Sequence, residues 1–180
     1  MDDKRTRFEA LVLPHLDAAH RLARWLNRSP GDADDIVQEA CMRAYRAFDT
    51  LRGPDARPWL LAIVRNCSLS ALAERRRRAH EPLTGEHEAL AQQAGAEPPP
   101  DPESASIERD EQRLLARLVA ALPEEQREVL LLREMEDMSY REIAEIAQVP
   151  IGTVMSRLAR ARAALKALRP QLEGEPHAMR

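Results

Sequence analysis

The apolar residues of the N-terminal part of the chain recur every three or four positions, the spacing that gives a helix one apolar face. The first such run covers 8–26, and it predicts one helix that ends in a polar stretch containing Pro and Gly. A second run covers 36–48 and is followed by a loop with a Gly-Pro pair. A third helix is expected to start near Pro58, since proline suits a first helical turn, and to end in the arginines at 75–78.

The C-terminal part shows the same helical spacing. An apolar face over 114–122 stops at Pro123, which together with the two glutamates behind it favours the start of another helix. Residues 139–142 (Ser-Tyr-Arg-Glu) match a capping box, so a further helix is expected over 139–148. After a short turn, Thr153 is expected to cap a longer helix. The apolar stripe of this last helix consists of Val154, Leu158, Ala161, Leu165 and Leu168.

Two helices that flank a tight turn, the second with a basic outer face, are typical of a helix-turn-helix. The second helix of such a motif fits the major groove of duplex DNA, and its N-terminal half reaches the base edges. The side chains expected to face bases or nearby phosphates are Thr153, Met155, Ser156, Arg157 and Arg160. Two more are expected to contact phosphate: Arg141, on the preceding helix, and Arg162. From these residues alone, an arginine-rich face that is merely solvated remains the alternative.

Charge divides the chain into three parts. Residues 81–107 hold six acidic residues, five prolines and neither Lys nor Arg, so they predict a flexible acidic linker that takes no part in a core. We therefore expect one domain at 1–80, a second at 108–172 and a flexible tail at 173–180. No stretch shows the alternation of a β-strand. The predicted fold class is all-α, with two small helical bundles joined by the linker and the helix-turn-helix in the second.

Composition narrows the possible functions. No apolar run approaches the roughly 18 residues of a membrane span, and the start of the chain lacks an apolar signal core, so we expect a cytoplasmic protein with no membrane insertion of its own. Cys41 and Cys67 are isolated thiols, which we interpret as small buried hydrophobes, with a redox pair as the alternative. The sequence has no Gly-rich phosphate loop, nucleophile constellation or metal-spaced ligand cluster. We expect no enzyme activity, no cofactor and no metal.

Three stretches carry a resemblance to a known family. The C-terminal stretch LPEEQREVLLLREMEDMSYREIAEIAQVPIGTVMSRLARARAAL resembles the promoter-binding domain of bacterial sigma factors of the extracytoplasmic-function (ECF) group. The stretch DADDIVQEACMRAYRAF is similar to that family's polymerase-binding helix, and RPWLLAIVRNCSLSALAERRRR to its −10-reading helix. The resemblance covers about residues 8–170. It implies a subunit that binds the β and β′ subunits of core RNA polymerase, recognises promoter DNA, helps to melt it, and is controlled by an anti-sigma factor.

The resemblance also implies roles for particular residues. Those implied to dock on polymerase are Asp34, Asp35, Gln38, Glu39 and Arg43, for which a solvated face with a Glu39–Arg43 ion pair is the alternative. Those implied to take the −10 DNA are Arg52, Arg57, Trp59, Arg65, Asn66, Arg75, Arg76 and Arg77. Trp59 is either a stacking platform or a core anchor at the start of the helix. The acidic linker is implied to imitate nucleic acid in the RNA exit path.

The chain departs from the family pattern at three positions and leaves two rival functions open. Ser70 stands where many relatives have Asp, Gln148 where they have Gly in the turn, and Met155 where Lys is frequent. The main rival function is a sigma-like decoy that sequesters an anti-sigma factor without binding DNA. The other is an ordinary helix-turn-helix transcriptional regulator, which would leave the N-terminal motif without a role.

Overall fold

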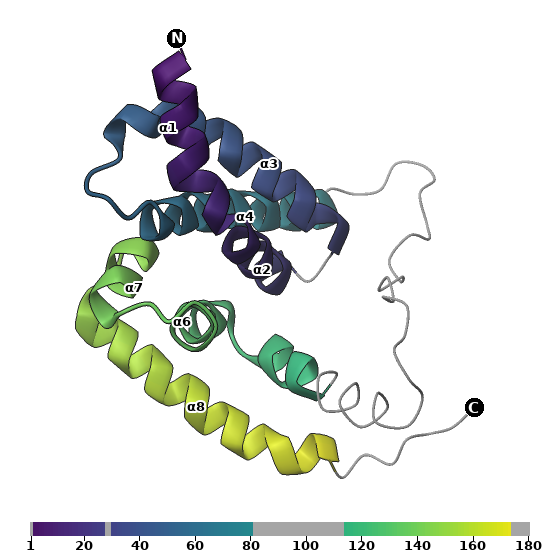
Figure 1. Ribbon diagram of the computed structural model, residues 1–180. Helices are drawn as coiled ribbons and strands as arrows, with labels where there is room; N and C mark the ends of the chain where they lie inside the picture. The colour runs from purple at the N-terminus through teal and green to yellow at the C-terminus, as the bar shows by residue number, and fades with distance from the viewer. Residues whose placement is uncertain (1, 28–29, 81–113, 174–180) are drawn as a thin grey trace, which may run out of the picture. The chain divides into compact units, whose positions relative to one another are not determined.

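The structure, a computed structural model of the 180-residue chain, describes residues 2–27, 30–80 and 114–173. Throughout these ranges every regular element is helical, and no strand occurs (Figure 1). The described helices form two compact units, the first built from the helices up to His80 and the second from α6, α8 and a helical segment at 114–121. The all-α prediction is thus confirmed for the described residues, while the predicted linker at 81–107 lies outside them.

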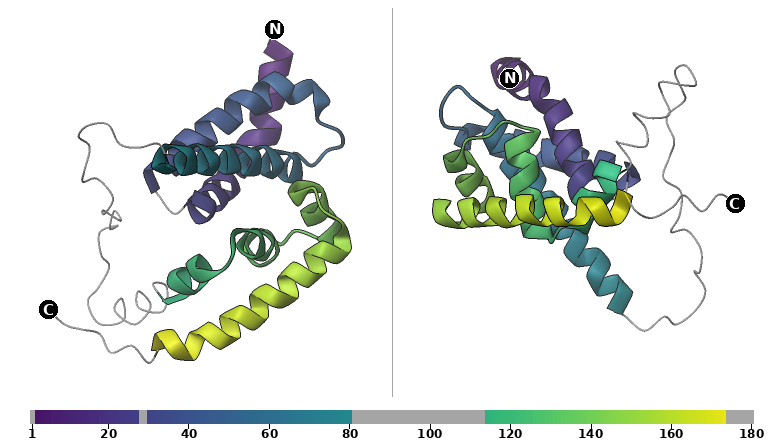
Figure 2. Two further views of the ribbon diagram at one scale, coloured as in Figure 1. Left: turned by 180° about the vertical axis from the view of Figure 1, so that it is seen from behind. Right: turned by 90° about the horizontal axis from the view of Figure 1, so that it is seen from below.

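The first unit is built on three long helices. Its elements are α1 (Asp2–Val12), a 3-10 turn at Leu13–His15, α2 (Leu16–Asn27), α3 (Pro30–Ala47), a 3-10 turn at Phe48–Thr50, and α4 (Arg57–His80). Helices α2, α3 and α4 pack against one another in pairs. Their shared core is made of aliphatic side chains, among them Leu22, Leu26, Val37, Ala40, Ala44, Leu60, Leu61 and Val64. The views in Figure 2 show α4 lying alongside both α2 and α3.

The single helix expected over 8–26 is wrong. The chain leaves α1 at Val12, passes through a 3-10 turn that contains Pro14, and enters α2 at Leu16. Proline has no backbone N–H and its ring clashes with the preceding turn, so an α-helix cannot continue through it unbroken. The apolar spacing across the break is retained because the turn is itself helical, which is why the pattern alone did not reveal it. The third helix, α4, begins at Arg57 with Pro58 in its first turn, as predicted.

The C-terminal helices include the helix-turn-helix. After the segment at 114–121 come α6 (Glu124–Glu134), α7 (Tyr140–Ala147) and α8 (Ile151–Glu173). Helix α6 packs against α8. The apolar stripe predicted for α8 is buried at Val154, Leu158 and Ala161, and half-buried farther along. None of the described helices combines the length and the apolar character needed to cross a bilayer.

Candidate functional site

Helix α7 begins with the capping box expected at Ser139. The backbone N–H of Ser139 donates to Oε2 of Glu142 at 2.7 Å, and the N–H of Glu142 donates to Oγ of Ser139 at 3.3 Å. Two of the amides that a helix leaves without a partner at its start are therefore satisfied by side chains three residues apart. The local sequence is enough to fix the first residue of the motif's first helix.

The turn between the two helices depends on a left-handed residue at Gln148, whose φ is 55°. Its N–H donates to the carbonyl of Glu145 at 3.4 Å, and the N–H of Val149 donates to the carbonyl of Ala144 at 3.1 Å. This pair of bonds is a Schellman motif, which ends a helix and turns the chain sharply. The motif usually has glycine at the left-handed position. Here Gln148 adopts that conformation, as expected from its place in the turn.

Helix α8 starts three residues earlier than expected. The carbonyl of Pro150 accepts hydrogen bonds from the N–H groups of Thr153 at 2.8 Å and Val154 at 3.2 Å, so Ile151 already belongs to the first turn. The prediction that Thr153 caps this helix is wrong. Proline cannot donate a backbone hydrogen bond, but its carbonyl is free to accept the first one. As a result Ile151 and Gly152 are part of the helix that was expected to read DNA.

The arginines of α8 do not share one environment. Arg160 is exposed and folds back on Ser156, with its Nε 3.3 Å from the Ser156 carbonyl and its Nη2 3.2 Å from Oγ. Arg162 pairs with Glu134 of α6 at 2.7 Å, and hydrogen bonds to Glu134 and Tyr140 raise its pKa further above the ordinary value. Arg141, on α7, is exposed. All three side chains are exposed at the surface, that of Arg162 within its ion pair to Glu134.

Arg157 differs from the outward orientation expected of it. Its side chain is only 14% exposed and forms an ion pair with Glu125, near the start of α6. Successive residues of a helix are rotated by about 100°, which turns position 157 away from Ser156 and toward the flank that meets α6. By contrast, Met155 is 54% exposed, and Ser156 is exposed beside it.

The predicted polymerase-binding side chains lie together on α3. Asp34, Asp35 and Gln38 are exposed, while Ile36 and Val37 between them are buried in the core. The expected ion pair of Glu39 with Arg43 forms, with 2.6 Å between Oε1 and Nε. These five polar side chains are spread over the exposed half of α3, with Asp34 and Arg43 at its two edges.

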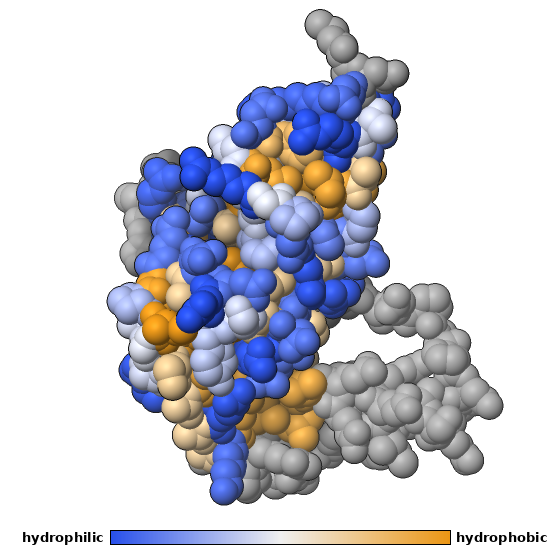
Figure 3. All heavy atoms as spheres, turned by 60° about the vertical axis from the view of Figure 1, so that its left-hand side comes forward, coloured by the Kyte–Doolittle hydropathy of each residue, from blue (hydrophilic) through white to orange (hydrophobic). Residues whose placement is uncertain are grey.

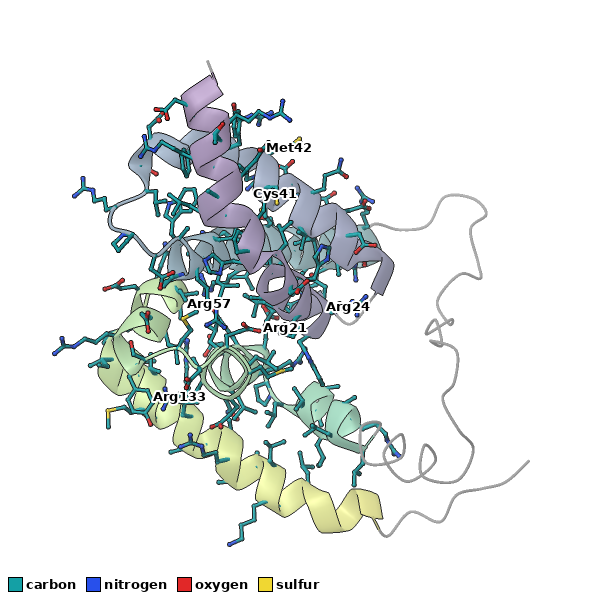
Figure 4. All side chains as sticks on the ribbon, in the orientation of Figure 1. Arg21, Arg24, Cys41, Met42, Arg57 and Arg133 are labelled. Carbon is teal, nitrogen blue, oxygen red and sulfur yellow. The ribbon has the colours of Figure 1, made fainter. Side chains whose placement is uncertain are left out.

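A hollow that the sequence did not reveal lies beside this face of α3. It has a volume of about 410 Å³ and is lined by Asp17, His20, Arg21, Arg24 and Asp34. His20 Nδ1 is 3.4 Å from Asp34 Oδ1, which joins α2 to α3. Arg21 and Arg24 lie on α2 (Figure 4). The acidic face of α3 thus borders basic side chains, a juxtaposition that depends on the packing of two helices.

The loop expected to take the −10 element is short and open. Arg52 and Gly53 are exposed, and Gly53 has a φ of 86°, a conformation that disfavours other residues. The loop leads into α4, where Oδ1 of Asp55 accepts a hydrogen bond from the N–H of Arg57 at 2.9 Å. Trp59, near the start of α4, is half-buried.

Farther along α4, the basic residues have unequal roles. Nη1 of Arg65 donates to Oδ1 of the exposed Asn66 at 3.3 Å, and Arg76 is exposed. Arg77 is exposed and forms an ion pair with Glu74, within its own helix.

Arg75 instead points toward the junction between α2 and α3. It forms an ion pair with Asp32, and its Nη1 donates to the carbonyl of Asn27 at 3.3 Å. Asn27 is almost fully buried at the end of α2. The contacts join three helices, which gives Arg75 a structural role that a run of four arginines does not disclose.

An aromatic cluster, also missed from the sequence, fastens α1 to the end of α3. The buried ring of Phe8 makes edge contacts with Tyr45 at 5.1 Å and with Phe48 at 5.4 Å between centroids. Lys4 lies over the Tyr45 ring and pairs with Asp49 at 2.7 Å. Within the described ranges, no group of three or more His, Cys, Asp or Glu side chains is placed to hold a metal ion.

Two family models match the chain, one in its N-terminal part and one in its C-terminal part. Sigma-70 region 2 matches residues 11–78, and Sigma-70 region 4 matches residues 112–165. The first match contains the α3 face and the −10 loop, and the second contains the helix-turn-helix.

Two relatives that match over most of their length are also sigma factors. The chain is 36% identical to the ECF RNA polymerase sigma-E factor of Escherichia coli strain K12, over 81% of this chain and 79% of that protein. It is also 36% identical to the RNA polymerase sigma-H factor of Pseudomonas aeruginosa, over 94% of this chain and 90% of the relative.

A solved structure supports the same fold. The sigma factor RpoE of Bartonella quintana, in complex with the anti-sigma factor NepR, matches with a TM-score of 0.69 and 27% identity, over 97% of this chain and 99% of the other. Together with the two sigma-70 regions and the full-length relatives, this shows that the chain belongs to the extracytoplasmic-function sigma factors of the sigma-70 family.

Proposed function

We propose that this chain is an alternative sigma factor that directs core RNA polymerase to specific promoters through three surfaces. The observation that carries the proposal is the presence, in one chain and in the family order, of sigma-70 regions 2 and 4, each with polar or basic side chains on an open face. A helix-turn-helix regulator would use the second unit but leave the α3 face and residues 11–78 without a role. A decoy would have no use for the exposed basic side chains of α8.

In this proposal α3 docks on polymerase. Its exposed acidic and amide side chains, at Asp34, Asp35 and Gln38, would meet a basic or polar surface of the β′ subunit, and the β subunit would complete the site. Charge complementarity of this kind raises the rate of association and selects the partner more than it strengthens binding. The Glu39–Arg43 pair contributes only about 0.3–0.5 kcal/mol as an exposed helical ion pair, so both side chains are free to exchange partners on docking.

The loop before α4 and the N-terminal half of α4 would hold the melted −10 strand. Unstacking a base costs a few kcal/mol, which stacking on an aromatic ring and contacts to the backbone offset. The half-buried Trp59 and the exposed Arg52 supply an aromatic ring and a cation on one short stretch. The exposed Arg76 and Arg77 at the far end of α4 would contact upstream phosphates.

Helix α8 would enter the major groove at the −35 element. Arg160 and Ser156 are exposed in its second and third turns, where recognition helices contact base edges. A bidentate arginine contact to guanine gives about 1–3 kcal/mol of discrimination. Arg141 and Arg162 would contact the flanking phosphates.

The chain would have no catalytic activity of its own, because polymerase carries out nucleotide addition. It would act in the bacterial cytoplasm, where polymerase and promoters are found. An anti-sigma factor would control it, as the RpoE–NepR complex of Bartonella quintana exemplifies for a relative. The acidic linker would occupy the RNA exit path until nascent RNA displaces it.

The proposal is tested by adding the purified full chain to core polymerase with fragmented genomic DNA and sequencing the run-off transcripts. Discrete start sites that share two spaced elements are expected. Arg160→Ala should reduce initiation about tenfold at these promoters while leaving polymerase binding unchanged, because the lost contact is to DNA. Arg117→Ala, on the helical segment before α6, serves as the control. Failure of the wild-type chain to bind core polymerase contradicts the proposal, and binding without initiation favours the decoy.

A further inference from the structure

The first two turns of α8 present an apolar strip on a helix that is otherwise basic outside. Ile151 is 43% exposed and Met155 is 54% exposed, and both are large enough to bury substantial area against a partner. Ile151 and Met155 are four residues apart, and Ala159 follows four later, so the three share one side of the helix. Gly152 lies beside them and is exposed, as is Ala159.

The backbone under the strip is open to close approach. A Cβ atom placed on Gly152 would have no neighbour within 4 Å, so space remains above the helix backbone at this point. Small residues at Gly152 and Ala159 therefore let α8 lie deep against a partner, with Ile151 and Met155 as the two projecting side chains. On the face of the molecule drawn in Figure 3, apolar surface is likewise confined to separate patches between larger hydrophilic areas.

Charge indicates what kind of partner fits this strip. The chain has no acidic residue between Pro150 and Leu168, and Arg160, Arg162 and Lys166 are all exposed on α8. A basic rim around an apolar strip is complementary to a polyanion that offers an apolar group at the contact. Duplex DNA meets that description in only one way, since the C5-methyl group of thymine is the sole apolar group on the major-groove edges of the four base pairs.

Two of the arginines near the strip are held by α6. Arg157 pairs with Glu125 and Arg162 pairs with Glu134, both at 2.7 Å. With Arg157 engaged by Glu125, the large exposed side chains of the first two turns are Ile151 and Met155. An apolar side chain pressed on the acceptors of guanine would strip them of water without replacing the hydrogen bond, which is unfavourable.

We propose that Ile151 and Met155 read thymine methyl groups in the −35 element, and that this strip sets a preference for A·T pairs there. The inference rests on the proposed sigma function and deepens it, because it names the base chemistry that α8 selects. Arg160 and Ser156 then contact hydrogen-bonding edges on the neighbouring side of the helix.

The test uses the full chain with core polymerase on a promoter found by run-off sequencing. Each thymine of the −35 element is replaced in turn by deoxyuridine, which removes only the methyl group. Burial of one methyl group changes binding about fourfold, so one or two positions should bind the holoenzyme about four times more weakly when demethylated. The wild-type protein suffices for this measurement, so it does not depend on the folding of any variant.

Variants then assign each methyl group to a side chain. Met155→Ala should abolish the difference between thymine and deoxyuridine at one position, and Ile151→Ala at another. Met135→Ala is the matched control, because Met135 is 40% exposed at the end of α6 and lies on neither helix of the motif. This control should keep the full fourfold sensitivity, and thermal unfolding checks that all three variants are folded.

Each other outcome has a distinct meaning. Initiation from defined promoters with no sensitivity to deoxyuridine, or a −35 element that lacks thymine, overturns the inference while leaving the sigma role intact. Normal binding to deoxyuridine duplexes combined with weak initiation by Ile151→Ala and Met155→Ala means that the strip contacts protein instead of DNA, which also overturns it. Absence of any promoter-specific initiation by the wild-type chain is the failure of the proposed function itself.

Discussion

Arg157 of the recognition helix is bound to Glu125 of α6, with 2.7 Å between Nη2 and Oε2. The two side chains differ in exposure, since that of Arg157 is 14% exposed and that of Glu125 is 70% exposed. The aliphatic part of the arginine is therefore packed in the domain, and only its guanidinium reaches the rim. An arginine expected to read DNA is a contact that holds α8 in place against α6.

Removal of this contact should weaken the second unit. We expect Arg157→Ala to lower the free energy of unfolding by about 1–2 kcal/mol, from lost packing together with a partly exposed ion pair, and Glu125→Ala by less than about 1 kcal/mol. Initiation that depends on the −35 element should fall with Arg157→Ala while polymerase binding is retained, since α3 is unaffected. Calorimetric unfolding of the two single variants and the double variant gives the coupling energy, expected at about 0.2–1 kcal/mol. Strict additivity would show that the pair contributes nothing.

At the left-handed position Gln148, substitution by glycine is expected to raise stability, whereas glycine within a helix usually lowers it. Gln148→Gly should stabilise the protein by about 0.5–1 kcal/mol, because glycine has no Cβ penalty at a φ of 55°. The control is the same change at Gln38, exposed within α3, where glycine should destabilise by about 1 kcal/mol. Thermal unfolding measures both. A loss of stability at both positions would mean that the side chain of Gln148 contributes more than its backbone conformation costs.

Two neighbouring arginines of α4 should separate a structural role from a nucleic-acid role. Arg75→Ala removes the ion pair with Asp32 and the hydrogen bond to the Asn27 carbonyl, so it should cost the first unit about 1–2 kcal/mol. Arg77→Ala should stay within about 0.5 kcal/mol of wild type, since the side chain is exposed and forms its ion pair within α4.

The measurement for this pair is convenient because both tryptophans of the chain lie in the first unit. Urea unfolding followed by tryptophan fluorescence reports on that unit, and a shift of the midpoint is expected for Arg75→Ala alone. Open-complex formation should fall with Arg77→Ala at unchanged stability. Equal midpoints for both variants would show that the junction contacts of Arg75 do not stabilise the fold.

The raised pKa values of the two cysteine thiols lead us to expect that the protein loses stability in alkaline solution. Burial raises the pKa of both Cys41 and Cys67 (Figure 4 shows Cys41 on α3), so the native state keeps these protons to higher pH than the unfolded chain does. Unfolded thiols ionise near about pH 8.5. Above that pH the native state binds more protons than the unfolded state, and stability must fall as the pH rises toward the raised native values.

The double variant Cys41→Ala/Cys67→Ala isolates this effect. Urea midpoints measured from about pH 7 to 9.5 should decline more steeply for wild type than for the double variant, whatever other groups titrate in that range. The raised pKa also lowers the thiolate fraction at neutral pH, so alkylation should be slow, which disfavours the redox alternative. Parallel pH profiles for the two proteins would show that burial does not govern these thiols.

Part of the candidate site could be predicted from short stretches of sequence. The capping box at Ser139 and the turn at Gln148 depend on contacts among residues fewer than six positions apart, so the residue types determine the geometry. The Glu39–Arg43 pair belongs to the same class, because a helix always brings positions four apart together. The break at Pro14 was also local, but it was hidden because a helical turn preserves the apolar spacing across it.

The sequence by itself determined the all-α class, the capping box at Ser139, the segregation of charge and the membership of the sigma family, since each follows from local spacing or from matched motifs. Only the tertiary structure decided which arginines are structural. Arg157 and Arg75 resemble their neighbours in sequence. Each nevertheless forms an ion pair with a carboxylate that lies more than 30 residues away, on another helix. Such pairs depend on how helices pack, and packing is set by the whole core, so no local pattern contains them.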